Sequence, residues 1–297
     1  MSGDSQIDID RACFYAGSGH KLMDMMILLV SSWILVSQDT ISSGTVSGNL
    51  AVRAEVKPGD TGYFVSVSTP EGSWQVGVDW RPGTDIQVTD DACLVLTQGK
   101  RMSVYRDGKL VWSMDIGNGL PLVMGEYILV RSNQSVALYF SSGFKPVGEY
   151  EVIPPMDISG AMVAGIWEAK LRLYRDKMKE WALPHEYPRF VEISGNGVAV
   201  AFPRNLVFFD FTGKALWDKA LPVSISALHY GGGLLWVAGT ERETGRATLW
   251  AFSEDGKERW KMTYHDPDEP AFVSSIHCDG ETLRVFVSRV LYTYKAQ

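Results

Sequence analysis

The stretches VYRDGKLVW (104–112), LYRDKMKEW (173–181), FDFTGKALW (209–217) and FSEDGKERW (252–260) repeat one pattern. An aromatic residue stands near the end of a strand, a tight turn follows, and Trp enters the next strand. A weaker copy, YFSSGFKPV (139–147), has Val in place of Trp. Such turns require a positive φ, which glycine adopts readily. Glycine lies four residues before the Trp position in four copies: Gly108, Gly143, Gly213 and Gly256. The pattern predicts recurring β-hairpins whose Trp packs between neighbouring units.

A second pattern, a turn rich in Gly and Asp before an apolar strand, occurs seven times along the chain. Its markers are Gly59, Asp90, Gly125, Ser159, Gly195, Gly231 and Asp279. Most steps between markers are close to 35 residues, the length of one propeller blade. The sequence therefore predicts an all-β fold, a seven-bladed β-propeller over residues 39–297. The alternative for many short strands is a β-sandwich, which gives no reason for turns at a fixed spacing.

Within each blade, we expect the strand after the Gly/Asp turn to be the inner one. The outer strand is then a short segment such as FVEIS (190–194) or ISALHY (225–230). Only two strands, LRVFVS (283–288) and VLYTYK (290–295), follow the last marker. We therefore expect N-terminal strands from residues 40–57 to complete the last blade and remove an exposed sheet edge.

The N-terminal segment, residues 1–38, contains the one long apolar run of the chain, LMDMMILLVSSWILV (22–36). Its length suits the apolar region of a secretion signal and is short for a spanning helix. We expect a hydrophobic helix over 22–36 that acts as a signal or membrane anchor. The alternative is a helix packed on the propeller or on a partner. The acidic residues upstream suit a translation start at Met23, Met25 or Met26.

Composition excludes several classes of function. The net charge of −7 argues against nucleic-acid binding, since phosphate affinity comes mainly from Lys and Arg. The three cysteines, Cys13, Cys93 and Cys278, have neither disulfide-framework nor zinc-site spacing and are expected to be buried free thiols.

Side by side, the copies of the hairpin resemble the PQQ-like (quinoprotein-type) repeat, in which an aromatic residue, an Asp/Gly turn and Trp recur in each blade. The resemblance covers about residues 59–297. It implies a propeller of the kind that acts as a scaffold in envelope assemblies. Quinoprotein dehydrogenases carry a vicinal cysteine pair, which this chain lacks, so no cofactor is expected.

Catalytic motifs are absent: the chain has no GxSxG, HExxH or Gly-rich phosphate loop. His229 and His277 both fall two residues before a repeat marker. They are expected near each other on the face formed by the connections between blades, although no third metal ligand is apparent. The expected inner strands, such as CLVLT (93–97) and VAVAF (198–202), are mainly apolar, which favours binding over catalysis.

The long step before the last marker comes from two extended loops, GTERETGRAT (239–248) and TYHDPDEPAF (263–272). Both are expected on one face of the disc, together with PHEYPRF (184–190). Loops on a rigid scaffold commonly carry function. The predicted partner-binding residues, for a basic protein surface or a cation, are Glu241, Arg242, Glu243, Arg246, His265, Asp266, Asp268 and Glu269. A solvated loop without a partner is the plain alternative.

The leading hypothesis is a non-catalytic scaffold for protein–protein interaction, membrane-anchored or extracytoplasmic. The second is a hydrolase or lyase with its site at the mouth of the propeller channel. The third is a soluble cytoplasmic scaffold, which applies if the apolar run packs on the ring.

Overall fold

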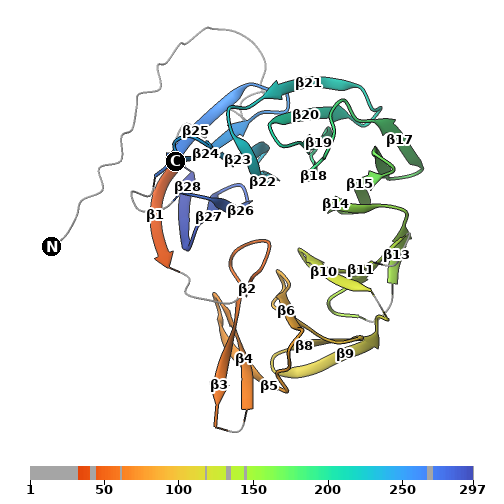
Figure 1. Ribbon diagram of the computed structural model, residues 1–297, viewed down its shortest axis with the longest axis vertical. Helices are drawn as coiled ribbons and strands as arrows, with labels where there is room; N and C mark the ends of the chain where they lie inside the picture. Colours follow the sequence, from red (N-terminus) through yellow and green to blue (C-terminus); the bar gives the residue numbers. More distant parts are fainter. Residues whose placement is uncertain are drawn as a thin grey trace, which may run out of the picture.

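The computed structural model describes residues 33–40, 45–60, 62–117, 119–131, 135–143, 146–265 and 270–296. These residues form seven four-stranded antiparallel sheets arranged in a ring (Figure 1), so the predicted seven-bladed propeller is confirmed. The first strand of each blade lies nearest the centre of the ring and the fourth lies at its rim (Figure 1).

The strands follow one another blade by blade along the chain. Blade 1 has β2 (Thr45–Val46), β3 (Arg53–Gly59), β4 (Gly62–Thr69) and β5 (Gly72–Val78); blade 2 has β6 (Thr84–Val88), β7 (Leu94–Gln98), β8 (Arg101–Arg106) and β9 (Lys109–Asp115); blade 3 has β10 (Leu120–Met124), β11 (Tyr127–Arg131), β12 (Val136–Phe140) and β13 (Pro146–Tyr150). Blade 4 has β14 (Ile153–Ser159), β15 (Met162–Trp167), β16 (Lys170–Tyr174) and β17 (Met178–Ala182); blade 5 has β18 (Phe190–Ile193), β19 (Gly197–Ala201), β20 (Asn205–Asp210) and β21 (Ala215–Ala220). Blade 6 has β22 (Ser224–Gly231), β23 (Leu234–Thr240), β24 (Ala247–Phe252) and β25 (Glu258–Tyr264); blade 7 has β26 (Val273–Cys278), β27 (Thr282–Val287), β28 (Val290–Ala296) and, from the N-terminal side, β1 (Trp33–Thr40).

The predicted order of strands within a blade is wrong by one position. In blades 2–7 the marker lies at the turn between the first and second strands, as Asp90 does between β6 and β7, whereas Gly59 lies at the turn between β3 and β4, the second and third strands of blade 1. In blades 2–7 the strand after the marker is therefore the second, and FVEIS and ISALHY contribute the first strands β18 and β22. The number of markers still equals the number of blades, because each blade carries one marker, although in blade 1 it lies at a different turn.

Ring closure by residues 40–57 is also wrong. With β26, β27 and β28 in place, blade 7 lacks one strand, and β1 supplies it by pairing antiparallel with β28. Residues 45–46 and 53–59 instead form β2 and β3 of blade 1. An N-terminal strand closes the last blade as expected, but it comes from further upstream.

The expected helix over 22–36 is contradicted at its C-terminal end, because residues 33–36 are the start of β1. Residues 22–32 lie outside the described part of the chain. An open edge of β28 leaves backbone N–H and C=O groups unpaired, and pairing with them outweighs any helical preference of the WILV sequence. The ring therefore includes residues 33–38, which the sequence assigned to the N-terminal segment.

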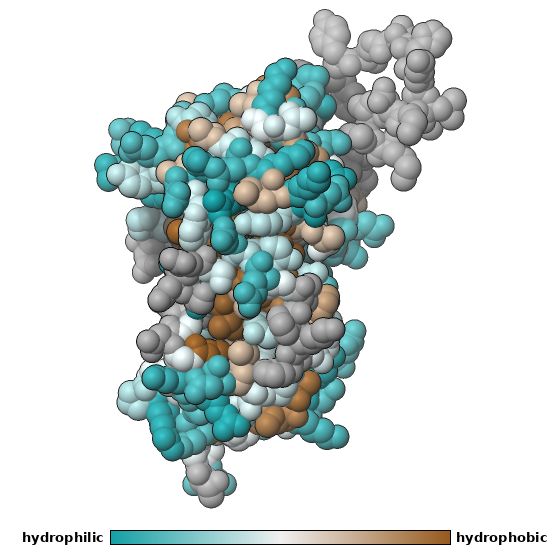
Figure 2. Space-filling model, turned by 90° about the vertical axis from the view of Figure 1, so that its right-hand side faces the viewer, coloured by the Kyte–Doolittle hydropathy of each residue, from teal (hydrophilic) through white to brown (hydrophobic). Residues whose placement is uncertain are grey.

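The core lies between the blades. Six clusters of buried apolar side chains fill the junctions from blade 1–blade 2 to blade 6–blade 7. Second strands such as β19, with all five residues buried, are covered on both faces. The rim is less apolar: the edge near β9, β13 and β17 is mainly hydrophilic, with apolar residues gathered near its middle (Figure 2).

The Trp of the repeat packs between neighbouring blades, as predicted. The ring of Trp217 in blade 5 lies against Gly256, the turn glycine of blade 6, where an added Cβ would be 3.0 Å from the indole. The indole N–H of Trp217 also donates to the carbonyl of Glu254 in the same turn, at 2.7 Å. Trp181 and Gly213 make the equivalent contact between blades 4 and 5. The turn and the Trp of the motif thus recognise each other across a blade junction.

Replacement of this glycine is predicted to destabilise the ring. Gly256 has a φ of +80°, so Gly256→Ala adds backbone strain and a clash with Trp217, and we expect a loss of about 1–2 kcal/mol. Gly143, at the same turn position in blade 3, has open space at its Cβ. Gly143→Ala is therefore the matched control, with little change. Denaturant unfolding measures both, and equal stability of the two variants would contradict the packing role.

Candidate functional site

The two long loops of blade 6 lie side by side. The backbone N–H of Ala271 donates to the carbonyl of Gly245 at 2.8 Å. The Thr240 hydroxyl donates to the Ala271 carbonyl at 2.9 Å, and Gly245 packs closely against Pro270. The β23–β24 connection and the blade 6–blade 7 connection therefore form one joined surface on a single face of the ring, called here the loop face.

The structure places five of the eight predicted binding residues. Glu241 is partly buried, and its carboxylate accepts a hydrogen bond of 2.8 Å from the Thr244 hydroxyl. The other four are exposed, and no ion pair joins them within the described residues: Arg242, Glu243, Arg246 and His265. Asp266, Asp268 and Glu269 lie outside the described part of the chain. The described charges on the loops are therefore balanced rather than acidic.

Two exposed aromatic residues on these connections were not singled out from the sequence. Phe272 is 51% exposed and Tyr187, in the blade 4–blade 5 connection, is 75% exposed. The backbone of Phe272 is fixed, since its carbonyl accepts from the Ser288 N–H at 2.7 Å. Loop hydropathy alone gives no signal for such residues, because the sequence does not show which aromatic side chains remain uncovered.

Hydrogen bonds between first strands join the loop face across blades 5, 6 and 7. The Arg189 guanidinium donates to the Ser224 hydroxyl at 3.1 Å and to the Ile225 carbonyl at 3.2 Å. The Ser226 hydroxyl donates to the Val273 carbonyl at 2.7 Å. The connections that carry Tyr187 and Phe272 therefore sit on a hydrogen-bonded platform.

A second set of polar residues lies on the first strands, around the centre of the ring. In blades 2, 4 and 5, one side chain of the first strand accepts a hydrogen bond from a backbone N–H of the first strand of the next blade. These side chains are called here the axial acceptors. Gln87 accepts from the Val123 N–H at 2.9 Å, Asp157 from the Ile193 N–H at 2.7 Å and Glu192 from the Tyr230 N–H at 3.2 Å. The sequence signal that could have found them is their spacing, since Asp157 and Glu192 lie 35 residues apart.

The axial carboxyl groups are electrostatically perturbed. Burial raises the pKa of Asp157, and this effect outweighs the backbone hydrogen bonds that it accepts, which lower the pKa. Burial, and then repulsion from Asp157, raise the pKa of Glu192 well above its ordinary value. The true inner strands thus carry ionisable groups, and the expectation of an apolar channel wall, made from the second strands, is wrong.

His229 and His277 occupy the same position in blades 6 and 7, and their ring centroids are 5.1 Å apart. They are neighbours as predicted, but they lie at the turn end of the first strands and not on the connection face. Burial, and then His277, lower the pKa of His229 to about 4. Burial also lowers the pKa of His277. The described residues contain no group of three or more His, Cys, Asp or Glu side chains able to hold a metal.

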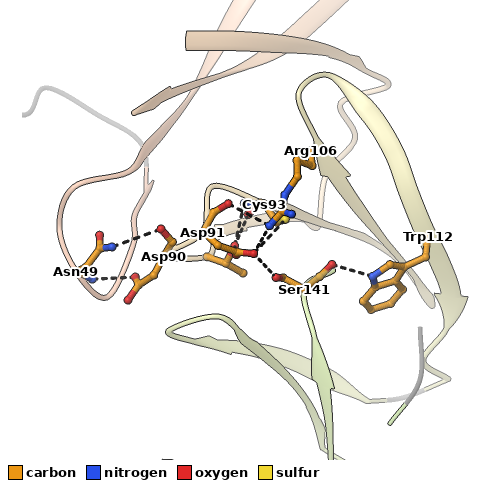
Figure 3. Close-up of polar contacts among 8 residues, drawn as sticks. Asn49, Asp90, Asp91, Cys93, Arg106, Trp112 and Ser141 are labelled. Atoms are coloured by element: carbon orange, nitrogen blue, oxygen red, sulfur yellow. Dashed lines mark hydrogen bonds and ion pairs between the residues drawn. The ribbon is translucent and has the colours of Figure 1, made fainter. Parts of the chain in front are cut away.

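A polar network joins blades 2 and 3 beside the turn between β6 and β7 (Figure 3). Asp91 forms an ion pair with Arg106 and accepts from the Ser141 hydroxyl at 2.6 Å. The Trp112 indole donates to the Ser141 carbonyl at 3.0 Å. Beside it, Cys93 is buried, and burial raises the pKa of its thiol.

The buried-thiol prediction is confirmed for the two cysteines that the structure describes. Cys93 and Cys278 are both free and buried, and burial raises the pKa of each. A raised pKa keeps a thiol protonated and unreactive. Cys13 lies outside the described residues.

Comparisons with known proteins give the fold but no family. No family model and no curated protein matches the sequence. BamB from Moraxella catarrhalis is similar with a TM-score of 0.57 at 10% identity, over 86% of this chain and 85% of that chain. BBS1N, solved in complex with ARL6DN, gives 0.56 at 16%, over 90% and 97%. Virginiamycin B lyase from Staphylococcus aureus gives 0.59 at 12%, over 90% and 100%.

Stability at acid pH should depend on His229. In the unfolded chain its pKa is near the ordinary 6.5, against about 4 in the folded protein. As pH falls from about 6.5 to about 4, the unfolded state gains a proton first and the free energy of unfolding falls. In His229→Gln this loss should be smaller by up to about 2 kcal/mol between pH 6.5 and 4.5.

The control for this measurement is His265→Gln, which replaces an exposed imidazole. Urea unfolding at several pH values compares both variants with wild type. Parallel pH curves for His229→Gln and wild type would show that the buried imidazole does not contribute.

Proposed function

We propose that this chain is a non-catalytic β-propeller scaffold that binds a protein partner through the loop face of blades 5–7. The observation that carries the proposal is the joined pair of loops in blade 6, where the Ala271 N–H to Gly245 carbonyl bond of 2.8 Å fixes two insertions together. A solvated loop without a partner does not require such a contact with a second insertion.

The composition of the loop face suits a protein partner. Binding energy in protein interfaces is concentrated in a few anchors, among which Trp, Tyr and Arg are enriched, surrounded by a polar rim. Tyr187 and Phe272 are exposed aromatic anchors, and Arg242, Glu243 and Arg246 provide exposed charges around them. The partner surface is therefore expected to combine apolar recesses with charges of both signs, including basic groups for Glu243.

The repeat chemistry and the structural likeness support a PQQ-like type of blade. The turn glycine and Trp of that repeat are paired here across blade junctions, and BamB is among the similar structures. Another similar propeller, BBS1N, is solved in a complex with ARL6DN. By analogy we infer that this chain works within a larger assembly.

Membrane attachment or export remains part of the proposal and is now restricted to the region before β1. Residues 33–40 pair with β28, so a cleavable or membrane-embedded segment has to end before Trp33. None of the described residues forms a helix long and apolar enough to cross a membrane. A cytoplasmic scaffold is the alternative that fractionation of the natural protein tests.

The second candidate function is a hydrolase or lyase at the channel mouth. The neighbouring carboxyls Asp157 and Glu192, both with raised pKa, are the observation in its favour, because general acids at neutral pH need such a shift. Both carboxyls accept backbone hydrogen bonds from the next blade, which gives them a structural role and favours the scaffold.

Partner capture should depend on the two exposed aromatic residues. The double variant Tyr187→Ser and Phe272→Ser removes both anchors, and we expect at least tenfold weaker capture of a partner from native extract, because each anchor typically contributes about 1–2 kcal/mol. The matched control is Met178→Ser and Leu216→Ser, which replaces two rim residues of 48% and 49% exposure. Equal capture by the two double variants would refute the loop face as the binding surface.

A further inference from the structure

The junction between blade 7 and blade 1, called here the seam, differs from the other six. Each of the six apolar clusters joins consecutive blades from blade 1 to blade 7, and none built from described residues crosses the seam. A cleft of about 330 Å³ lies there instead, between β3–β4 and β27–β28. This is within the range of small binding sites in proteins.

The alternation of residues in blade 1 explains why the seam is not packed. Ala54 of β3 is buried in the cluster shared with blade 2. Its neighbours Arg53 and Glu55 therefore point to the opposite face, toward blade 7, since adjacent residues of a strand alternate. On β27 of blade 7, Leu283 and Val285 are buried toward blade 6, so Arg284 between them points toward blade 1. Arg53, Glu55 and Arg284 thus lie on the sides of their strands that face the seam.

Each wall of the cleft carries one arginine beside a hydroxyl residue. Arg53 is the cross-strand partner of Ser68 in blade 1, and Arg284 is the cross-strand partner of Thr293 in blade 7. All four line the cleft, together with the almost fully buried Leu50 and Leu291. The cleft therefore presents two guanidinium groups and hydroxyls above an apolar floor.

The positive charge of the cleft is only partly compensated. No Asp or Glu is among the described residues that line the cleft, and the nearby Glu55 forms an ion pair with Lys57 at 3.5 Å. Arg284 has one weak ion pair, 3.5 Å from Asp279, and that carboxylate already accepts the Thr282 N–H at 2.8 Å. Arg53 is partly buried and has no hydrogen-bond or ion-pair partner among the described residues. A carboxylate that enters the cleft can pair bidentately with such a guanidinium.

We propose that the seam cleft binds an acidic peptide segment of a partner protein, with carboxylates on Arg53 and Arg284 and an apolar side chain on Leu50 and Leu291. Charge complementarity selects the carboxylates in a chain whose net charge is otherwise −7. The apolar floor between the arginines favours a peptide over a free anion, because a small anion has no apolar group to pack on Leu50 and Leu291. This site is separate from the loop face, so it stands or fails independently of the function proposed above.

Fluorescence anisotropy with the full-length protein tests the proposal. The probe is a short labelled peptide of alternating glutamate and leucine, and the matched probe has glutamine in place of glutamate. We expect wild type to bind the glutamate peptide at least tenfold more tightly. The double variant Arg53→Gln and Arg284→Gln should lose at least tenfold in affinity, and binding should weaken as salt is raised.

The control is Arg101→Gln and Arg259→Gln, which removes the same charge from two exposed arginines outside the cleft and should leave binding unchanged. Thermal unfolding of both double variants verifies that they fold. Equal affinity for the two peptides, or unchanged binding by Arg53→Gln and Arg284→Gln, overturns the proposal. Competition by inorganic phosphate at the same concentration as the peptide also overturns it, because the site is then one for a small anion.

Discussion

The packing of the repeat Trp between neighbouring blades is the interaction on which the ring depends, and at two junctions the Trp lies directly against the turn glycine of the next blade. Only a residue without a Cβ can lie against the indole at the distance seen for Trp217 and Gly256, and the positive φ of that glycine builds the hairpin itself. One short motif therefore determines both the turn within a blade and the packing between blades. Repetition of this motif, together with apolar second strands, accounts for the regular packing of consecutive blades from blade 1 to blade 7.

Closure of the ring depends on a different interaction. Strand β1 pairs with β28 and completes blade 7, whereas no apolar cluster of described residues joins blade 7 to blade 1. The ring is closed by backbone hydrogen bonds within a blade rather than by packing across the seam. The seam can therefore carry the two arginines of its cleft beside the buried Leu50 and Leu291, without an apolar cluster across it.

Most of the fold could be predicted from the sequence, because the period of the turn and Trp motifs reports a repeating sheet. The phase of the repeat could not, since the strands on both sides of Asp90 are equally short and the marker alone does not tell which one is inner. The strand Trp33–Thr40 was missed because its apolar residues continue a longer apolar run. Of the site, the two loops were located from their length alone. The exposure of Phe272 and the position of Arg53 and Arg284 in one cleft result from tertiary structure, which local sequence patterns do not report.

Binding surfaces on this molecule follow from departures from the regular blade: a joined pair of insertions in blade 6 and a polar seam at the point of closure. Both surfaces require that β1 closes the ring. Two truncations test this closure most directly, one without residues 1–32 and one without residues 1–40. Both lack the segment before β1, and only the second also lacks β1. We predict that the first unfolds and elutes like the full-length protein. The second should unfold at least about 10 °C lower and self-associate through the open edge of β28. Identical unfolding of the two truncations would contradict closure by β1.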